Sequence, residues 1–121
     1  MPIPLLICDD SVMARKQVRR ALPEDWDVEV TMAANGLEGL DAIRKGQGEM
    51  VFLDLTMPEL DGYGVLEAVR NEGLKCIVIV ISADIQPEAR ERVQKLGALD
   101  FIKKPVDGKK LQEVLERYGL L

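Results

Sequence analysis

The chain has 121 residues, of which 47% are hydrophobic, and this composition predicts one globular domain spanning residues 1–121 with a sizeable core. Its formal net charge is −5, so no excess of lysine and arginine favours direct binding to nucleic acid. No apolar run approaches the roughly 20 residues of a membrane span. The N-terminus also lacks the basic and apolar segments of a signal peptide, so we expect a cytoplasmic protein that acts away from membranes.

Histidine is absent, and the two cysteines, Cys8 and Cys76, both lie within apolar runs. The absence of histidine excludes catalytic Ser-His and Cys-His pairs as well as histidine metal sites. Two cysteines in apolar runs are typical of buried, reduced thiols in a cytosolic protein. Any phosphohistidine in the chemistry of this chain must therefore belong to a partner.

Apolar, β-branched segments alternate with segments of helical periodicity along the whole chain. The predicted strands are residues 3–8, 28–33, 50–53, 77–81 and 99–102, and the predicted helices are residues 12–22, 37–45, 64–71, 87–96 and 107–118. The segment 28–33 alternates apolar and polar residues, as in an edge strand, whereas 77–81 is continuously aliphatic, as in a strand covered on both faces. This alternation predicts an α/β three-layer sandwich with a parallel five-stranded sheet.

Reactive side chains follow four of the predicted strands. Asp9 and Asp10 follow the first strand, Asp54 the third, Ser82 the fourth and Lys104 the fifth. Because ligands bind at the carboxyl ends of the strands in such sheets, we expect these groups to converge. Neighbouring carboxylates repel one another unless a cation lies between them, and a set of oxygen ligands suits Mg²⁺ or Mn²⁺.

Asp54 is the candidate nucleophile, because it ends a buried strand and an ionised carboxylate is costly in an apolar setting. Phosphoryl transfer needs mainly positioning and charge neutralisation, which a metal ion and the Lys104 ammonium would supply. The Ser82 hydroxyl can donate to a further phosphoryl oxygen, and an aspartyl phosphate is an established covalent intermediate. Each group also has an ordinary interpretation, as a helix cap, a turn residue or a solvated lysine, so only their convergence favours chemistry.

The sequence resembles the receiver domain of two-component response regulators, and in length it is similar to the CheY-like members of that family. The resemblance covers essentially the whole chain. It rests on Asp9-Asp10, on Asp54 with Met57-Pro58 and Asp61-Gly62, on Ser82-Ala83 and on Lys104-Pro105. It implies a flavodoxin-like (βα)5 fold with strand order 2-1-3-4-5.

The resemblance also implies how a phosphoryl group is received. Asp54 resembles the phosphoacceptor, which takes the group from the phosphohistidine of a sensor histidine kinase. Asp10 and Asp54 resemble direct Mg²⁺ ligands, with the backbone carbonyl of Thr56 as a third ligand. Asp9 resembles the acid that acts on the metal mainly through water.

Three further residues are matched to roles by the same resemblance. Lys104 resembles the phosphate-binding lysine, and the peptide bond between Lys104 and Pro105 is expected to be cis. Ser82 resembles the switch hydroxyl. Phe101 resembles the aromatic residue that turns inward when Ser82 is drawn to the phosphate, although an ordinary core phenylalanine remains an alternative.

The implied function is a phosphoacceptor switch in a two-component phosphorelay, with chemotaxis as one candidate pathway, and not an enzyme beyond its own phosphorylation and autodephosphorylation. In this family a downstream protein partner reads the fourth helix, fifth strand and fifth helix, here residues 87–96, 99–102 and 107–118. The polar residues on these segments are equally consistent with ordinary solvated surface.

Two other functions use a similar set of residues. A Mg²⁺-dependent phosphatase of the haloacid dehalogenase type also uses a strand-end aspartate, but it needs a second acid where this chain has Thr56. A flavodoxin-like cofactor binder needs a phosphate-binding loop, which residues 9–13 do not resemble. The chain is either a complete regulator or a receiver from a longer protein, and segments 34–36, 84–87 and 98–107 resemble receivers joined to a CheC-like phosphatase domain.

Overall fold

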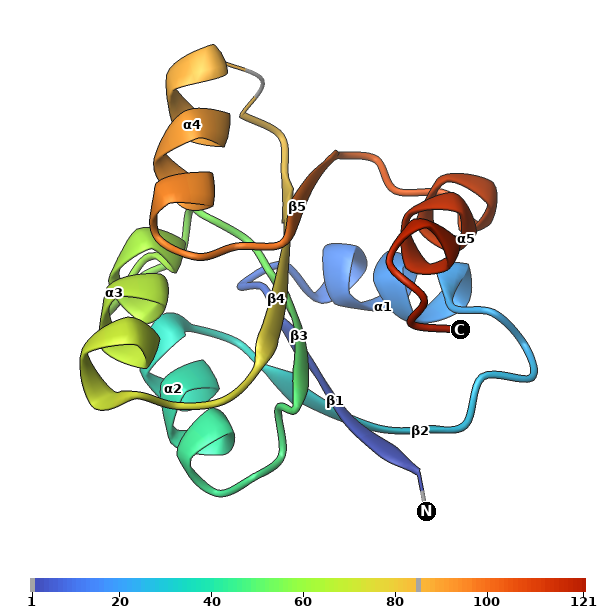
Figure 1. Cartoon of the computed structure of the whole chain (residues 1–121), viewed down its shortest axis with the longest axis horizontal. Coiled ribbons are helices and arrows are strands. Elements are labelled where there is room, and N and C mark those ends of the chain that lie inside the picture. Colours follow the sequence, from blue (N-terminus) through green and yellow to red (C-terminus); the bar gives the residue numbers. More distant parts are fainter. Residues whose placement is uncertain (1, 85) are drawn as a thin grey trace.

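The computed structural model describes residues 2–84 and 86–121, which form a five-stranded parallel sheet with helices on both faces (Figure 1). The strands are β1 Ile3–Cys8, β2 Val28–Ala33, β3 Met50–Leu53, β4 Ile77–Ser82 and β5 Asp100–Lys103. The helices are α1 Val12–Ala21, α2 Gly36–Arg44, α3 Gly62–Glu72, α4 Pro87–Lys95 and α5 Gly108–Arg117. The strand order is β2-β1-β3-β4-β5, which confirms the predicted flavodoxin-like topology.

The sheet lies between α1 and α5 on one face and α2, α3 and α4 on the other (Figure 1). Alternate residues of β3 supply the two hydrophobic cores, with Met50 and Phe52 in the α1–α5 core and Val51 and Leu53 in the other. All four side chains are buried, because β3 is the central strand and is covered on both faces. Asp54, which follows β3, therefore leaves the sheet at the middle of its carboxyl edge.

Strand β2 lies at the edge of the sheet, as its alternating sequence predicted. Its apolar residues Val28 and Val30 are only half-buried. In the described part of the chain, no helix has the length and apolar character needed to cross a membrane. Ile85, which belongs to the predicted 84–87 loop, and Met1 lie outside the described residues.

Helix α3 begins earlier than the sequence predicted, at Gly62 instead of Gly64. The Asp61 side chain caps the helix by accepting a hydrogen bond of 2.8 Å from the backbone N–H of Gly64. The low helix propensity of glycine concealed this first turn. A Cβ atom at Gly62 would lie 2.3 Å from the carbonyl oxygen of Asp54, so glycine is needed where α3 approaches that residue.

The other boundaries differ from the predicted ones by no more than one residue. Strand β5, for example, starts at Asp100 instead of Leu99.

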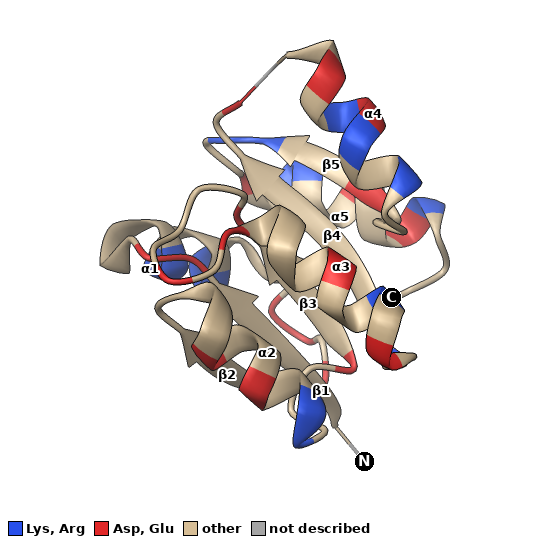
Figure 2. Cartoon of the chain, turned by 90° about the vertical axis from the view of Figure 1, so that its left-hand side faces the viewer, with Lys and Arg blue, Asp and Glu red and all other residues tan. Residues whose placement is uncertain are grey.

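The charges are distributed unevenly over the face formed by α2, α3 and α4 (Figure 2). Several lysine and arginine residues lie on α4, among them Arg90 and Arg92, while aspartate and glutamate residues mark α2 and α3.

Candidate functional site

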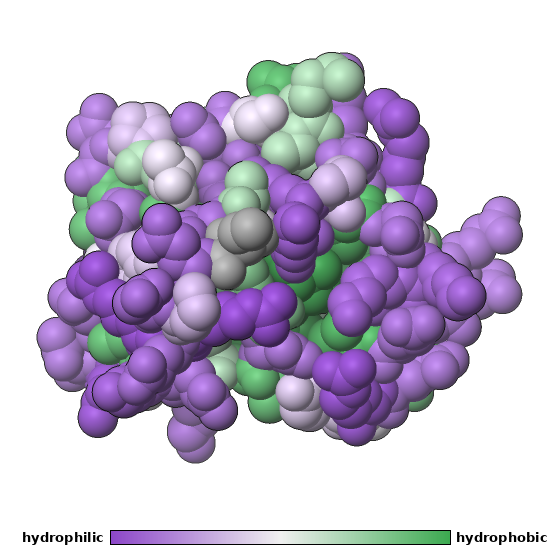
Figure 3. Space-filling model, turned by 90° about the horizontal axis from the view of Figure 1, so that it is seen from above, coloured by the Kyte–Doolittle hydropathy of each residue, from purple (hydrophilic) through white to green (hydrophobic). Residues whose placement is uncertain are grey.

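The carboxyl edge of the sheet brings together the predicted reactive side chains from β1, β3, β4 and β5. Parallel pairing aligns Cys8 of β1 with Leu53 of β3, so Asp9 and Asp54 leave their strands at the same level. The backbone N–H of Lys104 donates to the Ser82 carbonyl over 2.9 Å, which continues the pairing of β4 with β5. This edge lies toward the top of Figure 1, and the view from above in Figure 3 shows a largely hydrophilic face with small apolar patches.

Three carboxylates form the centre of the site. One oxygen each from Asp9, Asp10 and Asp54 lie within 4.8 Å of one another. Asp9 is 4% exposed and Asp54 is 6% exposed, whereas Asp10 faces solvent. These separations allow one cation to contact all three groups, and a donor set made of oxygen atoms fits a hard divalent ion.

Lys104 is paired more closely with Asp9 than with Asp54. Its Nζ atom lies 2.7 Å from Oδ2 of Asp9 and 3.5 Å from Oδ1 of Asp54. The second oxygen of Asp9 accepts a hydrogen bond of 2.9 Å from the backbone N–H of Ser11. Asp9 is therefore held by direct contacts from two sides, and its expected water-mediated contact with a metal stays a prediction.

Burial is the main reason that the pKa of the Asp54 carboxyl is raised, and the negative charge of Asp9 adds to the effect. The Lys104 ammonium acts in the opposite direction without cancelling it. Burial by itself would lower the pKa of Lys104, but the hydrogen bond to Asp9 and the charges of Asp54 and Asp9 outweigh it, so that pKa is raised. Ionisation of Asp54 therefore costs free energy in this environment, and a bound cation would reduce that cost.

Ser82 is buried, with 2% of its surface exposed. Its Oγ atom accepts a hydrogen bond of 3.1 Å from the backbone N–H of Asp84. Phe101 points inward, with 7% exposure, and belongs to the core beneath α2, α3 and α4. Thr56 is exposed in the loop that leaves β3. The peptide bond between Lys104 and Pro105 is cis, as the resemblance implied.

One contact that helps to build the site was not predicted from the sequence. The Nη1 atom of Arg15, on α1, donates to the backbone carbonyl of Asp9 over 2.6 Å. Ser11 is the N-cap of α1, and its side chain accepts a hydrogen bond from the backbone N–H of Ala14. Because α1 starts close to Asp9, the side chain of an arginine in the first turns of α1 can reach back to the carboxyl edge of the sheet.

Both cysteines are free thiols, as the sequence predicted, but only Cys8 is buried, whereas Cys76 is half-buried. Cys8 is buried beneath the site, where its Sγ atom lies 3.6 Å from the sulfur of Met57. Burial, followed by the charges of Asp9 and Asp54, raises the pKa of the Cys8 thiol to about 12. Cys8 therefore acts as a packing residue and not as a nucleophile.

A family model for the response regulator receiver domain matches residues 5–116. A protein-glutamate methylesterase/protein-glutamine glutaminase from Koribacter versatilis is 39% identical over 113 residues, which covers 91% of this chain and 31% of that protein. A C4-dicarboxylate response regulator from Priestia megaterium is 34% identical, over 94% of this chain and 50% of that protein. The chain thus spans half or less of the length of these curated relatives.

A solved structure with the same fold is the CheX-CheY-BeF3-Mg²⁺ complex from Borrelia burgdorferi. The matched chain is 31% identical and superposes with a TM-score of 0.85, over 98% of this chain and 90% of that one. Together with the strand order and the convergence of the motif residues, these matches lead to one conclusion. The chain belongs to the family of CheY-like response regulator receiver domains, the signalling modules of two-component systems that take phosphate from histidine kinases and signal to output partners.

Proposed function

We propose that the chain is a phosphorylation switch in which Asp54 accepts a phosphoryl group from the phosphohistidine of a sensor kinase. The observation that carries the proposal is the position of Asp54, buried at the centre of the carboxyl edge and 3.5 Å from the Lys104 ammonium. In the transfer, a carboxylate oxygen of Asp54 bonds to phosphorus while the phosphorus–nitrogen bond breaks. The electron pair of that bond stays on the imidazole nitrogen of the donor.

We infer that Mg²⁺ is the cofactor, with Mn²⁺ as a substitute, and that Asp9, Asp10, Asp54 and the backbone carbonyl of Thr56 hold it. The bound ion would offset the negative charge of the carboxylates and of the phosphoryl oxygens. The close approach of three carboxylate oxygens supports this assignment. A similar protein from Borrelia burgdorferi forms a CheX-CheY complex with BeF3 and Mg²⁺, which supports the same class of ligands here.

Lys104 and Ser82 are the proposed groups that respond to the phosphoryl group. The Lys104 ammonium already lies between Asp9 and Asp54, so it can contact a phosphoryl oxygen on Asp54 with a small movement. The Ser82 hydroxyl donates to a second oxygen, and the loop that contains it moves accordingly. Phe101 is already inward, so its packing beside α4 is the feature that reports the change to a protein partner at α4, β5 and α5.

The function of the whole protein depends on whether an output domain is attached, because the curated relatives are longer than this chain. A receiver domain that controls an attached output domain is the alternative to a switch that acts alone. The relative from Koribacter versatilis carries the name of an enzyme, which supports an enzymatic output domain. The CheC-like output domain expected from the sequence stays a prediction.

The test is incubation with acetyl phosphate and Mg²⁺, followed by intact-mass measurement. We expect the mass to rise by one phosphoryl group, the adduct to be removed by hydroxylamine, and Asp54→Asn to abolish it. Asp61→Asn is the matched control, because Asp61 is an exposed acid in the same loop and asparagine also caps helices. Repeated turnover of a phosphate monoester without a covalent adduct would support the phosphatase alternative instead.

A further inference from the structure

Helix α4 is attached to the rest of the domain by few apolar contacts. Only Ala89 and Val93 of its nine residues are buried, and both side chains are small. Helix α5, in contrast, buries Leu111, Val114 and Leu115. Since most helix stability in proteins comes from packing an apolar face, the position of α4 must depend strongly on its other contacts.

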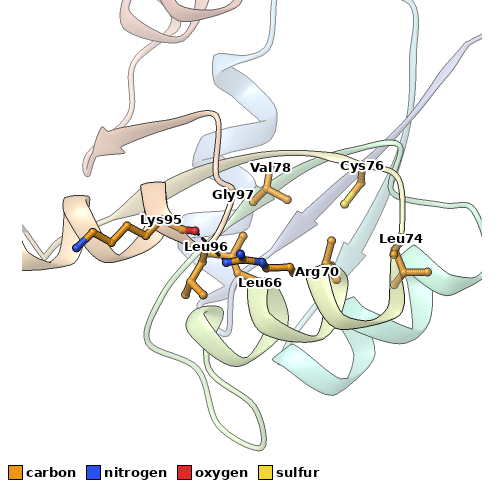
Figure 4. A pocket seen from close by; sticks show the side chains of 10 residues that line it. Leu66, Arg70, Leu74, Cys76, Val78, Lys95, Leu96 and Gly97 are labelled. Carbon is orange, nitrogen blue, oxygen red and sulfur yellow. Dashed lines mark hydrogen bonds between the residues drawn. The ribbon is translucent and has the colours of Figure 1, made fainter.

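The C-terminal ends of α3 and α4 are separated by an open groove with a volume of about 360 Å³ (Figure 4). Leu66, Leu96 and Val78 contribute to its apolar lining. Arg70 crosses the groove from α3, and its Nη1 atom donates to the backbone carbonyl of Lys95 over 3.2 Å. This end of α4 is therefore held to α3 by an exposed hydrogen bond and not by a packed interface.

Two arginine–aromatic contacts hold the middle of α4. The guanidinium carbon of Arg92 lies 3.9 Å from the centre of the Tyr63 ring on α3. The guanidinium carbon of Arg90 lies 5.0 Å from the centre of the Phe101 ring on β5. Both separations are within the range of attractive cation–π contacts, and the first is a close stack.

Tyr63 belongs to the first turn of α3, which is fixed to the backbone beside Asp54. The N–H of the preceding residue, Gly62, donates to the carbonyl of Leu55 over 2.9 Å. The Cα of Gly62 lies so close to the carbonyl of Asp54 that no side chain fits between them. The Tyr63 backbone therefore follows any displacement of the residues around Asp54.

The electrostatic surroundings of Tyr63 include an acid of the loop that follows β4. Burial and then the charge of Asp84 raise the pKa of the Tyr63 hydroxyl. The backbone N–H of Asp84 donates to the Ser82 hydroxyl oxygen. Tyr63 thus contacts α4 through Arg92, while the turn that carries it is anchored beside Asp54 through Gly62.

We propose that Tyr63 and Arg92 are positioning residues of the switch, whose stack holds α4 in the arrangement seen here, in which Lys104 is paired with Asp9 and the Ser82 hydroxyl accepts from Asp84. This inference rests on the proposed function, because it takes α4 as part of the output face. A displacement of the backbone around Asp54 on phosphorylation shifts the first turn of α3 through its contact with Gly62, and this shift disturbs the stack. A contact that favours one state must, by linkage, weaken binding of any ligand that favours the other.

Hydrogen exchange in the full chain tests the first half of the proposal, without any phosphoryl mimic. In Tyr63→Leu, we expect the amides of α4 to exchange about two- to fivefold faster than in the wild type, which corresponds to the loss of an exposed cation–π contact. The amides of α5 should not change, and Tyr63→Phe, which keeps the ring, should match the wild type. Equal exchange in Tyr63→Leu and wild type, or faster exchange in Tyr63→Phe as well, would overturn the stack as the holding contact.

Beryllofluoride with Mg²⁺ tests the second half, because it mimics a phosphoryl group on an aspartate. We expect Tyr63→Leu and Arg92→Gln each to bind it about two- to fivefold more tightly than the wild type, measured by ¹⁹F NMR. The double variant should bind no more tightly than either single variant, because both remove one contact. An affinity for beryllofluoride that is unchanged in the variants would refute the coupling between the stack and the phosphorylation site. A wild-type chain that binds no beryllofluoride would instead refute the proposed function. Hydrogen exchange would still decide in that case whether the stack holds α4.

Discussion

Lys104 donates its short hydrogen bond to Asp9, at 2.7 Å, although the candidate phosphoacceptor is its neighbour Asp54 at 3.5 Å. The ammonium group therefore offsets mainly the charge of the acid beside Asp54 and contacts Asp54 itself more loosely. Both contacts are shielded, since the Lys104 side chain is 23% exposed and the Asp9 side chain is 5% exposed. Such a partly buried, charge-assisted contact is worth more than a surface ion pair.

Replacing Lys104 by methionine keeps most of the side-chain volume and removes the charge. We expect phosphorylation by acetyl phosphate to slow by about 10- to 100-fold, because a hydrogen bond to a charged group contributes roughly 1.5–3 kcal/mol. Initial rates from intact-mass measurements provide the test. The control is Lys103→Met, at an exposed position one residue earlier, which should keep the wild-type rate. Equal rates for the two variants would show that the ammonium of Lys104 has no part in the transfer.

Removal of the metal should destabilise the folded chain. The clustered carboxylates of Asp9, Asp10 and Asp54 repel one another without a cation, so Mg²⁺ binds the folded state preferentially. At a free Mg²⁺ concentration 100 times its Kd, we expect a gain of about 2.7 kcal/mol over the chelated sample. Urea unfolding with and without EDTA measures this difference. Asp10→Asn should abolish most of the gain, and a full gain in that variant would remove Asp10 from the ligand set.

The sequence predicted most of the fold because the strands are continuous apolar runs. The first three strands were predicted with the bounds that the structure has, including the half-buried edge strand β2. The predicted start of α3 was wrong, because the close approach of Asp54 requires glycine at position 62 whatever its helix propensity. Helix propensity and periodicity depend on residues that are close in the sequence, whereas this glycine is required by a tertiary contact.

The residues of the candidate site could be predicted from the sequence, but the contacts between their side chains could not. Strand order and strand ends were enough to bring Asp9, Asp54 and Lys104 together. Which carboxylate receives the lysine depends on side-chain torsions, and the sequence contains no signal for them. The stack of Arg92 on Tyr63 was missed for the same reason, since it joins two helices through side chains that periodicity assigns to ordinary surface.

Alanine at Gly62 should destabilise the domain. Its Cβ would meet the Asp54 carbonyl oxygen at 2.3 Å and the Cα of Leu55 at 2.8 Å, so the backbone beside Asp54 must shift. Overpacking of this kind typically costs about 1–3 kcal/mol in unfolding free energy. Gly108→Ala is the matched control at the first residue of a helix, where the nearest atom to a new Cβ is 3.6 Å away. Urea unfolding should separate the two variants, and equal stability would contradict the close approach of α3 to Asp54.

The ion pair between α2 and α3 should make a small, pH-dependent contribution to stability. Arg44 donates to both carboxylate oxygens of Glu72, at 2.8 Å and 2.6 Å, and this hydrogen bonding lowers the pKa of Glu72 from its ordinary value of 4.5. An acid with a lower pKa in the folded chain adds stability above its unfolded pKa and loses that stability as the pH falls through the folded value. Because both side chains are exposed, salt should weaken the effect.

The comparison of wild type with Arg44→Gln measures that contribution. The unfolding free energy of the wild type should be the higher one near neutral pH, and the difference should vanish once the pH has fallen below the lowered pKa of Glu72 in the folded chain. Arg19→Gln is the control, at an exposed arginine outside the ion pairs found among the described residues. A difference that persists at low pH would assign the effect of Arg44 to packing instead of charge.

The position of the phosphoryl group tests the central claim most directly. After incubation with acetyl phosphate and Mg²⁺, borohydride reduces an aspartyl phosphate to homoserine, and peptide mass spectrometry locates the changed residue. We predict homoserine at position 54, and neither at position 9 nor at position 10, with the conversion lost in Asp54→Asn. Reduction at Asp9 or Asp10, or an unmodified chain under conditions in which Mg²⁺ is bound, would contradict the assignment of Asp54 as the phosphoacceptor.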